Sequence, residues 1–217
     1  MQNIHFRFKI DYVLGPASAS NFICTHQSLE EPEYVLKDHV TLYCLTPTQA
    51  FFVESDPGID VLDSNVNCFM AVAQFLKARK LIRLPINEFH KLAETLPNCD
   101  ENLIFVTNTA RCGSTLLCQI FEQTGQMLSL SEPHVLNALS LYQDSMPQRD
   151  LDRLVLNSVR MLCKPINRPI RGYVMKTTAP AIYSVPVFMR LFPQAKHLFM
   201  YREGLEVGSQ SIIVWYI

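Results

Sequence analysis

Residues 103–117 read LIFVTNTARCGSTLL, and the order of residue types in this stretch decides the fold that we expect for the second half of the chain. Residues 103–107 form a short apolar run typical of a buried parallel strand, whereas residues 114–123 have the pattern of a helix. A polar loop joins the two. Because the N–H groups and the dipole at the start of such a helix attract anions, this turn is a candidate phosphate-binding loop.

The loop contains the residue types that an anion site needs. Arg111 supplies a permanent positive charge, and Gly113 lets the backbone pass close to a ligand. Ser114 and Thr115 add hydroxyl donors in the first turn of the helix, and Cys112, between the charge and the glycine, belongs to the same predicted site. The alternative interpretation is an ordinary strand-to-helix turn.

The loop differs from the loop of ATP and GTP hydrolases, which follows the pattern G-x-x-x-x-G-K-[ST]. Asn108 stands at the first glycine position of that pattern, and Ser114 stands at its lysine position. The cation precedes the second glycine by two residues instead. The sequence therefore gives poor support to a nucleotide hydrolase.

The residues after the loop continue to alternate between helix and strand patterns. Further apolar strands are predicted at residues 173–176 and 197–201, and helices at 150–163, 181–192 and 203–211. This alternation predicts a three-layer α/β fold with a mainly parallel sheet.

The first hundred residues have a different pattern. Residues 39–54 read as a β-hairpin, residues 67–83 as a helix ended by Pro85, and residues 87–96 as a second helix. No set of residues in this part suggests chemistry, which favours a packing or interaction role.

A polar, turn-forming stretch separates these two patterns. We therefore predict a domain boundary near residue 100, with a small α+β module of unknown role at 1–100 and the P-loop domain at 101–217.

Composition narrows the possible partners and location. The chain has 19 basic and 20 acidic residues and a net charge of -1, so we expect no nucleic-acid partner. Its seven cysteines form no C-x-x-C pair and no Cys/His cluster, so we expect no metal. We see no signal peptide and no run of about 18 apolar residues, so a cytoplasmic protein without a membrane segment is the expectation.

Two further sequence motifs place charged residues directly after predicted or apolar segments. Residues 191–209 read LFPQAKHLFMYREGLEVGS, in which Arg202 follows an apolar strand, and residues 128–136 read LSLSEPHVL. Lys176 ends the strand predicted at 173–176, at the sheet edge where α/β folds bind ligands. Less specific interpretations are a solvated arginine, a helix capped by Ser131 and a surface lysine.

The three motifs, in their order along the chain, resemble those of the sulfotransferases that use 3′-phosphoadenosine 5′-phosphosulfate, including the carbohydrate-type and bacterial glycolipid-type families. The loop is similar to their R-[SC]-G-S-T-L-L pattern. Residues 191–209 look like F-P-x-A-K followed by a strand and an arginine, and residues 128–136 contain their S-E-P element. The resemblance covers roughly residues 101–211, about half of the chain.

The resemblance implies a P-loop fold and two sites for one nucleotide. Arg111 and the loop through Thr115 are expected to hold the 5′-phosphosulfate, and Arg202 is expected to hold the 3′-phosphate. The family also uses a serine for the 3′-phosphate, but its usual spacing falls on Gln210 here. Ser209 is our preferred substitute.

The resemblance also implies catalytic roles. A proton must leave the acceptor hydroxyl as its oxygen attacks sulfur, and a carboxylate or an imidazole can accept it. Glu132 is our first candidate for this base and His134 our second. Lys176 is expected to neutralise charge on the leaving oxygen, while Arg111 stabilises charge on the phosphosulfate.

The resemblance implies transfer of a sulfuryl group to a hydroxyl or amine of a small-molecule or carbohydrate acceptor, with no metal. Members of the family continue well past the 3′-phosphate helix, so the chain looks truncated at its C-terminus. The resemblance therefore predicts family membership more firmly than it predicts activity of a chain of this length. The alternatives are a P-loop nucleotide kinase or other phosphotransferase, and a non-catalytic family member that acts as a binding protein.

Overall fold

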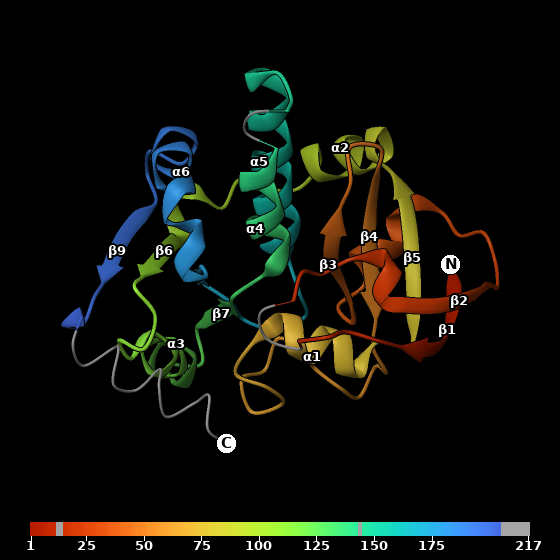
Figure 1. The fold of residues 1–217 in the computed structure, drawn as a ribbon, viewed down its shortest axis with the longest axis horizontal. Helices are drawn as coiled ribbons and strands as arrows, with labels where there is room; N and C mark the ends of the chain where they lie inside the picture. The colour runs from red at the N-terminus through yellow and green to blue at the C-terminus, as the bar shows by residue number, and fades with distance from the viewer. Residues whose placement is uncertain (12–14, 143–144, 205–217) are drawn as a thin grey trace.

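The computed structural model describes residues 1–11, 15–142 and 145–204. Within them, two sheets lie on opposite sides of a central group of helices (Figure 1). The first sheet is built from residues before position 86, and the second from residues after position 102. No helix in the described ranges is long and apolar enough to cross a membrane.

The first sheet has five strands in the order β2-β1-β5-β4-β3, and each pair of neighbouring strands is antiparallel. The strands are β1 (Gln2–Arg7), β2 (Phe22–His26), β3 (Val40–Leu45), β4 (Gln49–Glu54) and β5 (Lys80–Pro85). The predicted hairpin at residues 39–54 is confirmed as β3 and β4. Sequence patterns did not indicate β1 or β2.

The helix predicted at residues 67–83 is only partly present. Helix α1 covers Met70–Lys77, and the chain then enters β5, which pairs with β1 and β4. Leu81, Ile82 and Leu84 are buried there, so two strand partners and a hydrophobic core override the helical spacing. Helix α2 (Ile86–Glu94) confirms the helix predicted at residues 87–96, and Pro85 occupies its N-cap position.

The second sheet is parallel and has four strands in the order β7-β8-β6-β9. They are β6 (Leu103–Asn108), β7 (Met127–Ser131), β8 (Gly172–Lys176) and β9 (Lys196–Met200). This confirms an α/β arrangement with a parallel sheet in the second half. The sequence analysis missed β7, although the alternating MLSLS is a strand pattern.

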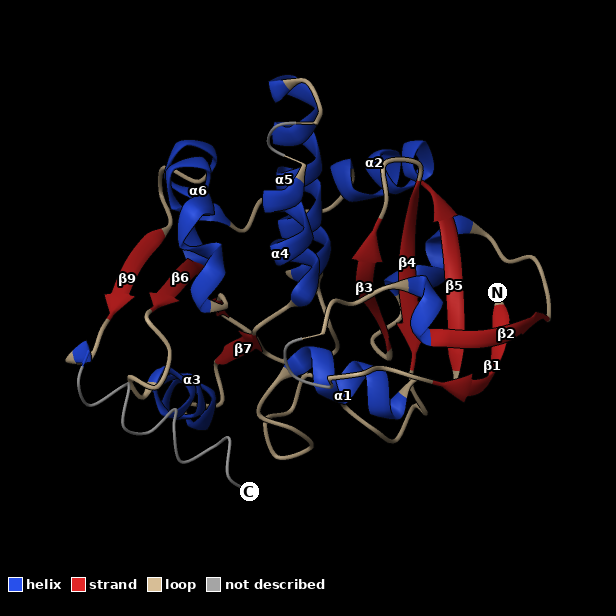
Figure 2. Ribbon diagram, viewed as in Figure 1, coloured by secondary structure: helices blue, strands red, loops and turns tan. Residues whose placement is uncertain are grey.

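Helices cover both faces of the parallel sheet (Figure 2). On one face, α3 (Ser114–Gln123) places Cys118 against Val106 and Val174. On the other, Phe105 stacks on Phe188 with ring centroids 4.7 Å apart. Helices on that side are α4 (His134–Leu141), α5 (Gln148–Leu162) and α6 (Val185–Leu191).

Two helix predictions here differ in their outcome. Helix α5 agrees with the predicted helix at 150–163, whereas residues 181–192 are not one α-helix. The 3-10 helix η4 (Ala179–Ser184) comes first, and α6 begins at Val185 with Pro186 in its first turn. Proline fits that position because it has no N–H to donate within the helix.

The helices α4 and α5 also contact β3 of the first sheet, so one hydrophobic cluster extends through both halves. It includes Phe52 and Phe89 from the first half and Phe105 and Leu130 from the second. The predicted boundary near residue 100 falls between the sheets. The division into two domains stays a prediction, because the core is shared.

Candidate functional site

The carboxyl ends of four parallel strands bring the predicted residues to one edge of the second sheet. Glu132 follows β7, Lys176 ends β8, the loop 109–113 follows β6 and Arg202 follows β9. Strand β6 lies between β8 and β9. Ligands of open α/β sheets bind at this edge, where neighbouring strands connect in opposite directions.

The loop 109–113 has an unusual backbone. Ala110 and Arg111 have φ values of 64° and 51°, and Gly113 has 85°. Glycine reaches this left-handed region without strain, whereas alanine and arginine do not. Surrounding contacts must therefore hold the first two residues in place.

Asn108 provides two of these contacts. Its Nδ2 donates to the carbonyl oxygen of Thr177 at 2.8 Å, and its Oδ1 accepts from the N–H of Ala110 at 2.9 Å. On the other side, the N–H of Thr109 donates to the carbonyl oxygen of Met200 at 3.1 Å. The loop is thereby joined to the strand on each side of β6.

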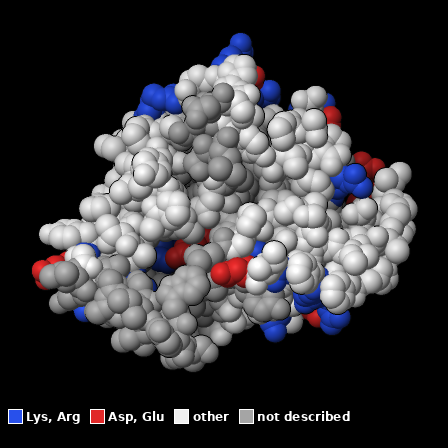
Figure 3. All heavy atoms as spheres, in the orientation of Figure 1, with Lys and Arg blue, Asp and Glu red and all other residues white. Residues whose placement is uncertain are grey.

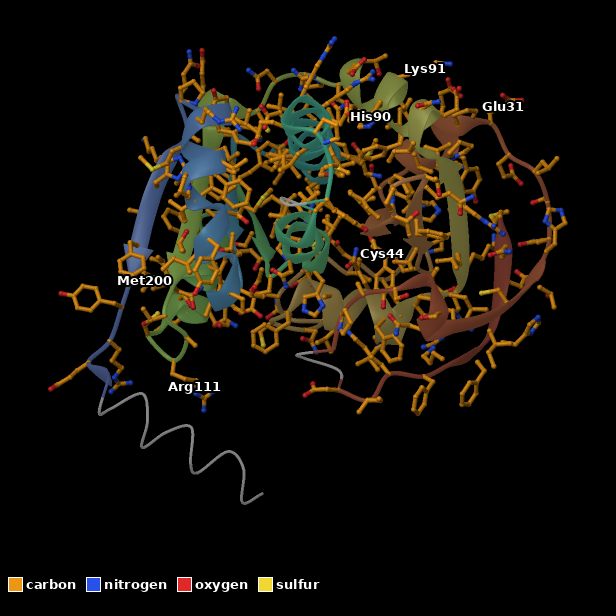
Figure 4. The ribbon with its side chains drawn as sticks, turned by 45° about the horizontal axis from the view of Figure 1, so that its top comes forward. Glu31, Cys44, His90, Lys91, Arg111 and Met200 are labelled. Atoms are coloured by element: carbon orange, nitrogen blue, oxygen red, sulfur yellow. The ribbon has the colours of Figure 1, made fainter. Side chains whose placement is uncertain are left out.

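Helix α3 begins directly after this loop, with Gly113 at its N-cap. Because glycine has no side chain, it cannot cap the first N–H groups of the helix, which suits them to an external anion. Arg111 is exposed, Cys112 and Thr115 are half-buried, and Ser114 is buried. Figure 4 shows Arg111 at the end of the molecule towards which β6 runs.

Buried Lys176 and half-buried Glu132 form an ion pair beside the loop. The Lys176 Nζ donates to Glu132 Oε1, and the N–H of Glu132 donates back to the carbonyl oxygen of Lys176 at 2.8 Å. Glu132 also has a positive φ of 56°. Lys176 is only 2% exposed, so its interpretation as a surface lysine is wrong.

An aromatic ring from the first half of the chain lies over this pair. The Nζ of Lys176 is 5.2 Å from the ring centroid of Phe69, within the range of a cation–π contact. Sequence analysis could not find this contact, because 107 positions separate the two residues and no local pattern links them.

A buried thiol lies beneath the loop helix. Burial raises the pKa of Cys118 to about 11, and the positive charge of Lys176 opposes that shift. The thiol is therefore protonated near neutral pH. Val174, two residues before Lys176 on the same strand, packs against Cys118 of α3, so the side chain of Lys176 also leaves the sheet on the α3 side.

Ser131 and His134 lie on either side of Glu132 in the sequence. Ser131 ends β7, is buried, and its Oγ has no hydrogen-bond partner among the described residues. The interpretation of Ser131 as a helix cap is therefore wrong. His134 is the first residue of α4 and is also buried.

Arg202 is exposed two residues after the end of β9. Since β6 and β9 are neighbours, Arg111 and Arg202 follow adjacent strand ends. Ser209, and all but the first two residues of the helix predicted at 203–211, lie outside the described residues.

The face of the molecule seen in Figure 3 carries its charged side chains in several separate places. On the face seen in Figure 3, Lys and Arg side chains lie mostly at the edges of the view and do not merge into one basic patch. Among the residues that the structure describes, no group of three His, Cys, Asp or Glu side chains could hold a metal ion.

Comparison with protein-family models, with curated proteins and with solved structures found no significant match to this chain.

Proposed function

We propose that the chain binds 3′-phosphoadenosine 5′-phosphosulfate and transfers its sulfuryl group to an acceptor. The observation that carries the proposal is the convergence of four adjacent strand ends. Each end is followed or ended by a residue with a role in this reaction: Arg111 in the loop, Glu132, Lys176 and Arg202. Sequence patterns alone predict a role for each of these four residues.

In this proposal the loop 109–113 and the first N–H groups of α3 bind the 5′-phosphosulfate, with Arg111 adding charge. Arg202 binds the 3′-phosphate. The neighbouring positions of β6 and β9 support binding of one nucleotide across both strand ends.

The ion pair supplies the groups for the chemical step. As the acceptor oxygen forms its bond to sulfur, Glu132 takes the proton from that oxygen. The bond between sulfur and the phosphate oxygen breaks, and the electron pair leaves with 3′,5′-bisphosphoadenosine. Lys176 stabilises the charge that develops on the departing oxygen. His134 is the second candidate for the base.

Thermal unfolding with three nucleotides tests this assignment. We expect 3′,5′-bisphosphoadenosine at 100 times its Kd to stabilise the folded chain by about 2.7 kcal/mol, because it binds only the folded state. ADP should stabilise it much less. Protection by Mg-ATP without any effect of a 3′-phosphate would instead support a P-loop phosphotransferase.

A further inference from the structure

Two of the seven cysteines lie next to each other, although 64 positions separate them in the sequence. The Cys163 thiol donates a hydrogen bond to the Cys99 sulfur. Both side chains are buried, at 3% and 6% exposed, and both belong to the hydrophobic cluster that extends through the two halves of the chain. All seven cysteines are free thiols in the structure. This contact therefore brings together two groups that can form a covalent bond.

Both cysteines lie where a helix begins or ends. Cys99 is the N-cap of the 3-10 helix η3 (Asp100–Asn102), directly before β6, and Cys163 is the C-cap of α5. A disulfide needs its two sulfur atoms about 2.05 Å apart, closer than a hydrogen bond holds them. The small movement that this requires is easiest at helix ends, because the regular hydrogen bonding of the helix stops there.

The two thiols differ in reactivity. The hydrogen bond from Cys163 has the largest effect on the pKa of Cys99 and lowers it, and the charge of Arg160 also lowers it, while burial and Asp100 act in the opposite direction. Burial raises the pKa of Cys163 well above its ordinary value, and the hydrogen bond to Cys99 adds to that shift. Since the thiolate is the form that attacks an oxidant, Cys99 should react first and Cys163 second.

A cation is available beside Cys99. The Nε of Arg160 is buried and has no hydrogen-bond partner among the described residues. A guanidinium donor of this kind can stabilise negative charge on the Cys99 sulfur as it reacts. Asp100 competes with this effect, but its Oδ2 already accepts a hydrogen bond from the N–H of Gln194 at 3.3 Å.

The chain that covers Cys99 is short and close to solvent. Pro97 and Asn98 before it are exposed, and so are Glu101 and Asn102 just after it. A short connecting segment with exposed neighbours opens locally at a lower cost in free energy than the whole fold. A small oxidant can therefore reach the Cys99 sulfur without global unfolding.

We propose that Cys99 and Cys163 are a peroxide-sensitive thiol pair that forms a disulfide in the folded chain. First, the Cys99 sulfur attacks one oxygen of hydrogen peroxide, the O–O bond breaks, and water leaves with the thiol proton. The product is a sulfenic acid at Cys99. Next, the Cys163 sulfur attacks the Cys99 sulfur, the S–O bond breaks, and a second water leaves with the Cys163 proton. The two thiols lose two electrons, and the peroxide gains them.

This pair is separate from the proposed nucleotide site. Cys99 precedes the amino end of β6, whereas the candidate site lies beyond the carboxyl ends of the strands. The disulfide would join the start of β6 to the end of α5 and restrict the unfolded chain, which stabilises the fold. Oxidation should therefore raise stability and leave the affinity for 3′,5′-bisphosphoadenosine unchanged.

Peptide mapping without reduction tests the proposal on the folded chain. The wild-type protein is treated with hydrogen peroxide at pH 7, the remaining thiols are alkylated, and the peptides are identified by mass spectrometry. We expect the peptides that contain Cys99 and Cys163 to be joined. Thermal unfolding of the same sample should show a Tm higher by about 10 °C, and reduction with dithiothreitol should reverse both changes.

Three variants assign the two steps. Cys163→Ser should leave Cys99 as a sulfenic acid, which dimedone labels, because no second thiol is present to displace the oxygen. Cys99→Ser should leave Cys163 unreacted. The matched control is Cys24→Ser, which removes a half-buried thiol on β2 and should still form the cross-link.

The wild-type map is decisive even if a variant does not fold. If the joined peptides appear only after unfolding in urea, or if other cysteines are oxidised while Cys99 stays alkylated, the inference is overturned. Equal labelling of Cys99 by dimedone in the wild-type chain and in Cys163→Ser would also overturn it, because Cys163 would then not react with the sulfenic acid.

Discussion

At the scale of single residues, the backbone strain seen in the described residues lies at the edge of the second sheet. In the described ranges, the non-glycine residues with positive φ are Ala110, Arg111 and Glu132. Each such residue costs about 1–2 kcal/mol, so folding alone does not favour them at these positions. Two of the three carry charged groups that we assign to binding or catalysis.

We predict two roles for Gly113: it adopts the left-handed backbone conformation that the loop needs, and it leaves room for the nucleotide to approach the start of α3. Gly113→Ala should destabilise the fold by about 1 kcal/mol, because alanine is strained at a φ of 85°. It should also weaken binding of 3′,5′-bisphosphoadenosine. Urea denaturation and calorimetric titration measure the two effects.

Gly125 provides a matched control, since it has a φ of 69° at the other end of the same helix. Gly125→Ala should cost a similar free energy of unfolding but leave nucleotide affinity unchanged. Equal losses of affinity in both variants would mean that Gly113 has a purely structural role.

The ion pair of Lys176 and Glu132 allows a second prediction. Lys176→Met should lower the free energy of unfolding by about 3 kcal/mol, because it leaves the Glu132 carboxylate largely buried without its partner. The double variant Lys176→Met with Glu132→Gln should recover part of that loss. Chemical denaturation of the two variants provides the test, and a double variant less stable than the single one would contradict this account.

At the scale of elements, the segment after α5 links the two halves of the chain. Lys164 Nζ donates to the carbonyl oxygens of Val35, Lys37 and Val40 at 2.7, 2.6 and 2.5 Å. Asp38 favours the charged form, but burial has the larger effect and lowers the pKa of Lys164 to about 7.

This pKa predicts how stability changes with pH. Between pH 7 and the ordinary lysine value of 10.5, the unfolded chain binds more protons at Lys164 than the folded chain. Stability should therefore rise with pH in this window, by up to about 1.4 kcal/mol per pH unit. Below pH 7 the group is protonated in both states and the slope disappears.

Comparison with Lys164→Met isolates this contribution from other titrating groups. The free energy of unfolding of both proteins is measured by urea denaturation at pH 7 and at pH 9. The wild-type value minus the variant value should increase with pH. No change between the two pH values would mean that the three carbonyl oxygens hold the ammonium group charged throughout this window, and the account of Lys164 would be contradicted.

Local sequence patterns predicted some elements well. They failed where pairing with strands from distant parts of the chain determines the secondary structure. Helix α3 and strand β6 follow from the apolar run, the glycine and the helical spacing of residues 103–123. Residues 80–83 continue the helical spacing of α1, yet they join β5 because strands from elsewhere in the chain pair with them. No local signal contains that information.

At the scale of the whole molecule, the sequence predicted which residues follow the strand ends at one edge of the second sheet, but not how the first half of the chain packs over them. Arg111, Glu132, Lys176 and Arg202 follow strand ends, which strand and turn patterns can indicate. The burial of Lys176 beneath Phe69 depends on how the segment 61–70 packs against β7 and α3. That packing is a property of the tertiary fold.

The central claim is that two arginines at adjacent strand ends bind opposite phosphates of one nucleotide. Calorimetric titration with 3′,5′-bisphosphoadenosine and with AMP, which lacks only the 3′-phosphate, tests it directly. Arg111→Ala should weaken binding of both ligands about 10-fold or more, since each loses a charge-assisted contact. Arg83→Ala, an exposed arginine of β5, is the control.

The decisive result concerns Arg202→Ala. We predict that it weakens binding of 3′,5′-bisphosphoadenosine about 10-fold or more and leaves AMP binding unchanged. If the wild-type chain binds neither nucleotide, or if Arg202→Ala affects both ligands equally, the two arginines do not share one nucleotide and the account is contradicted.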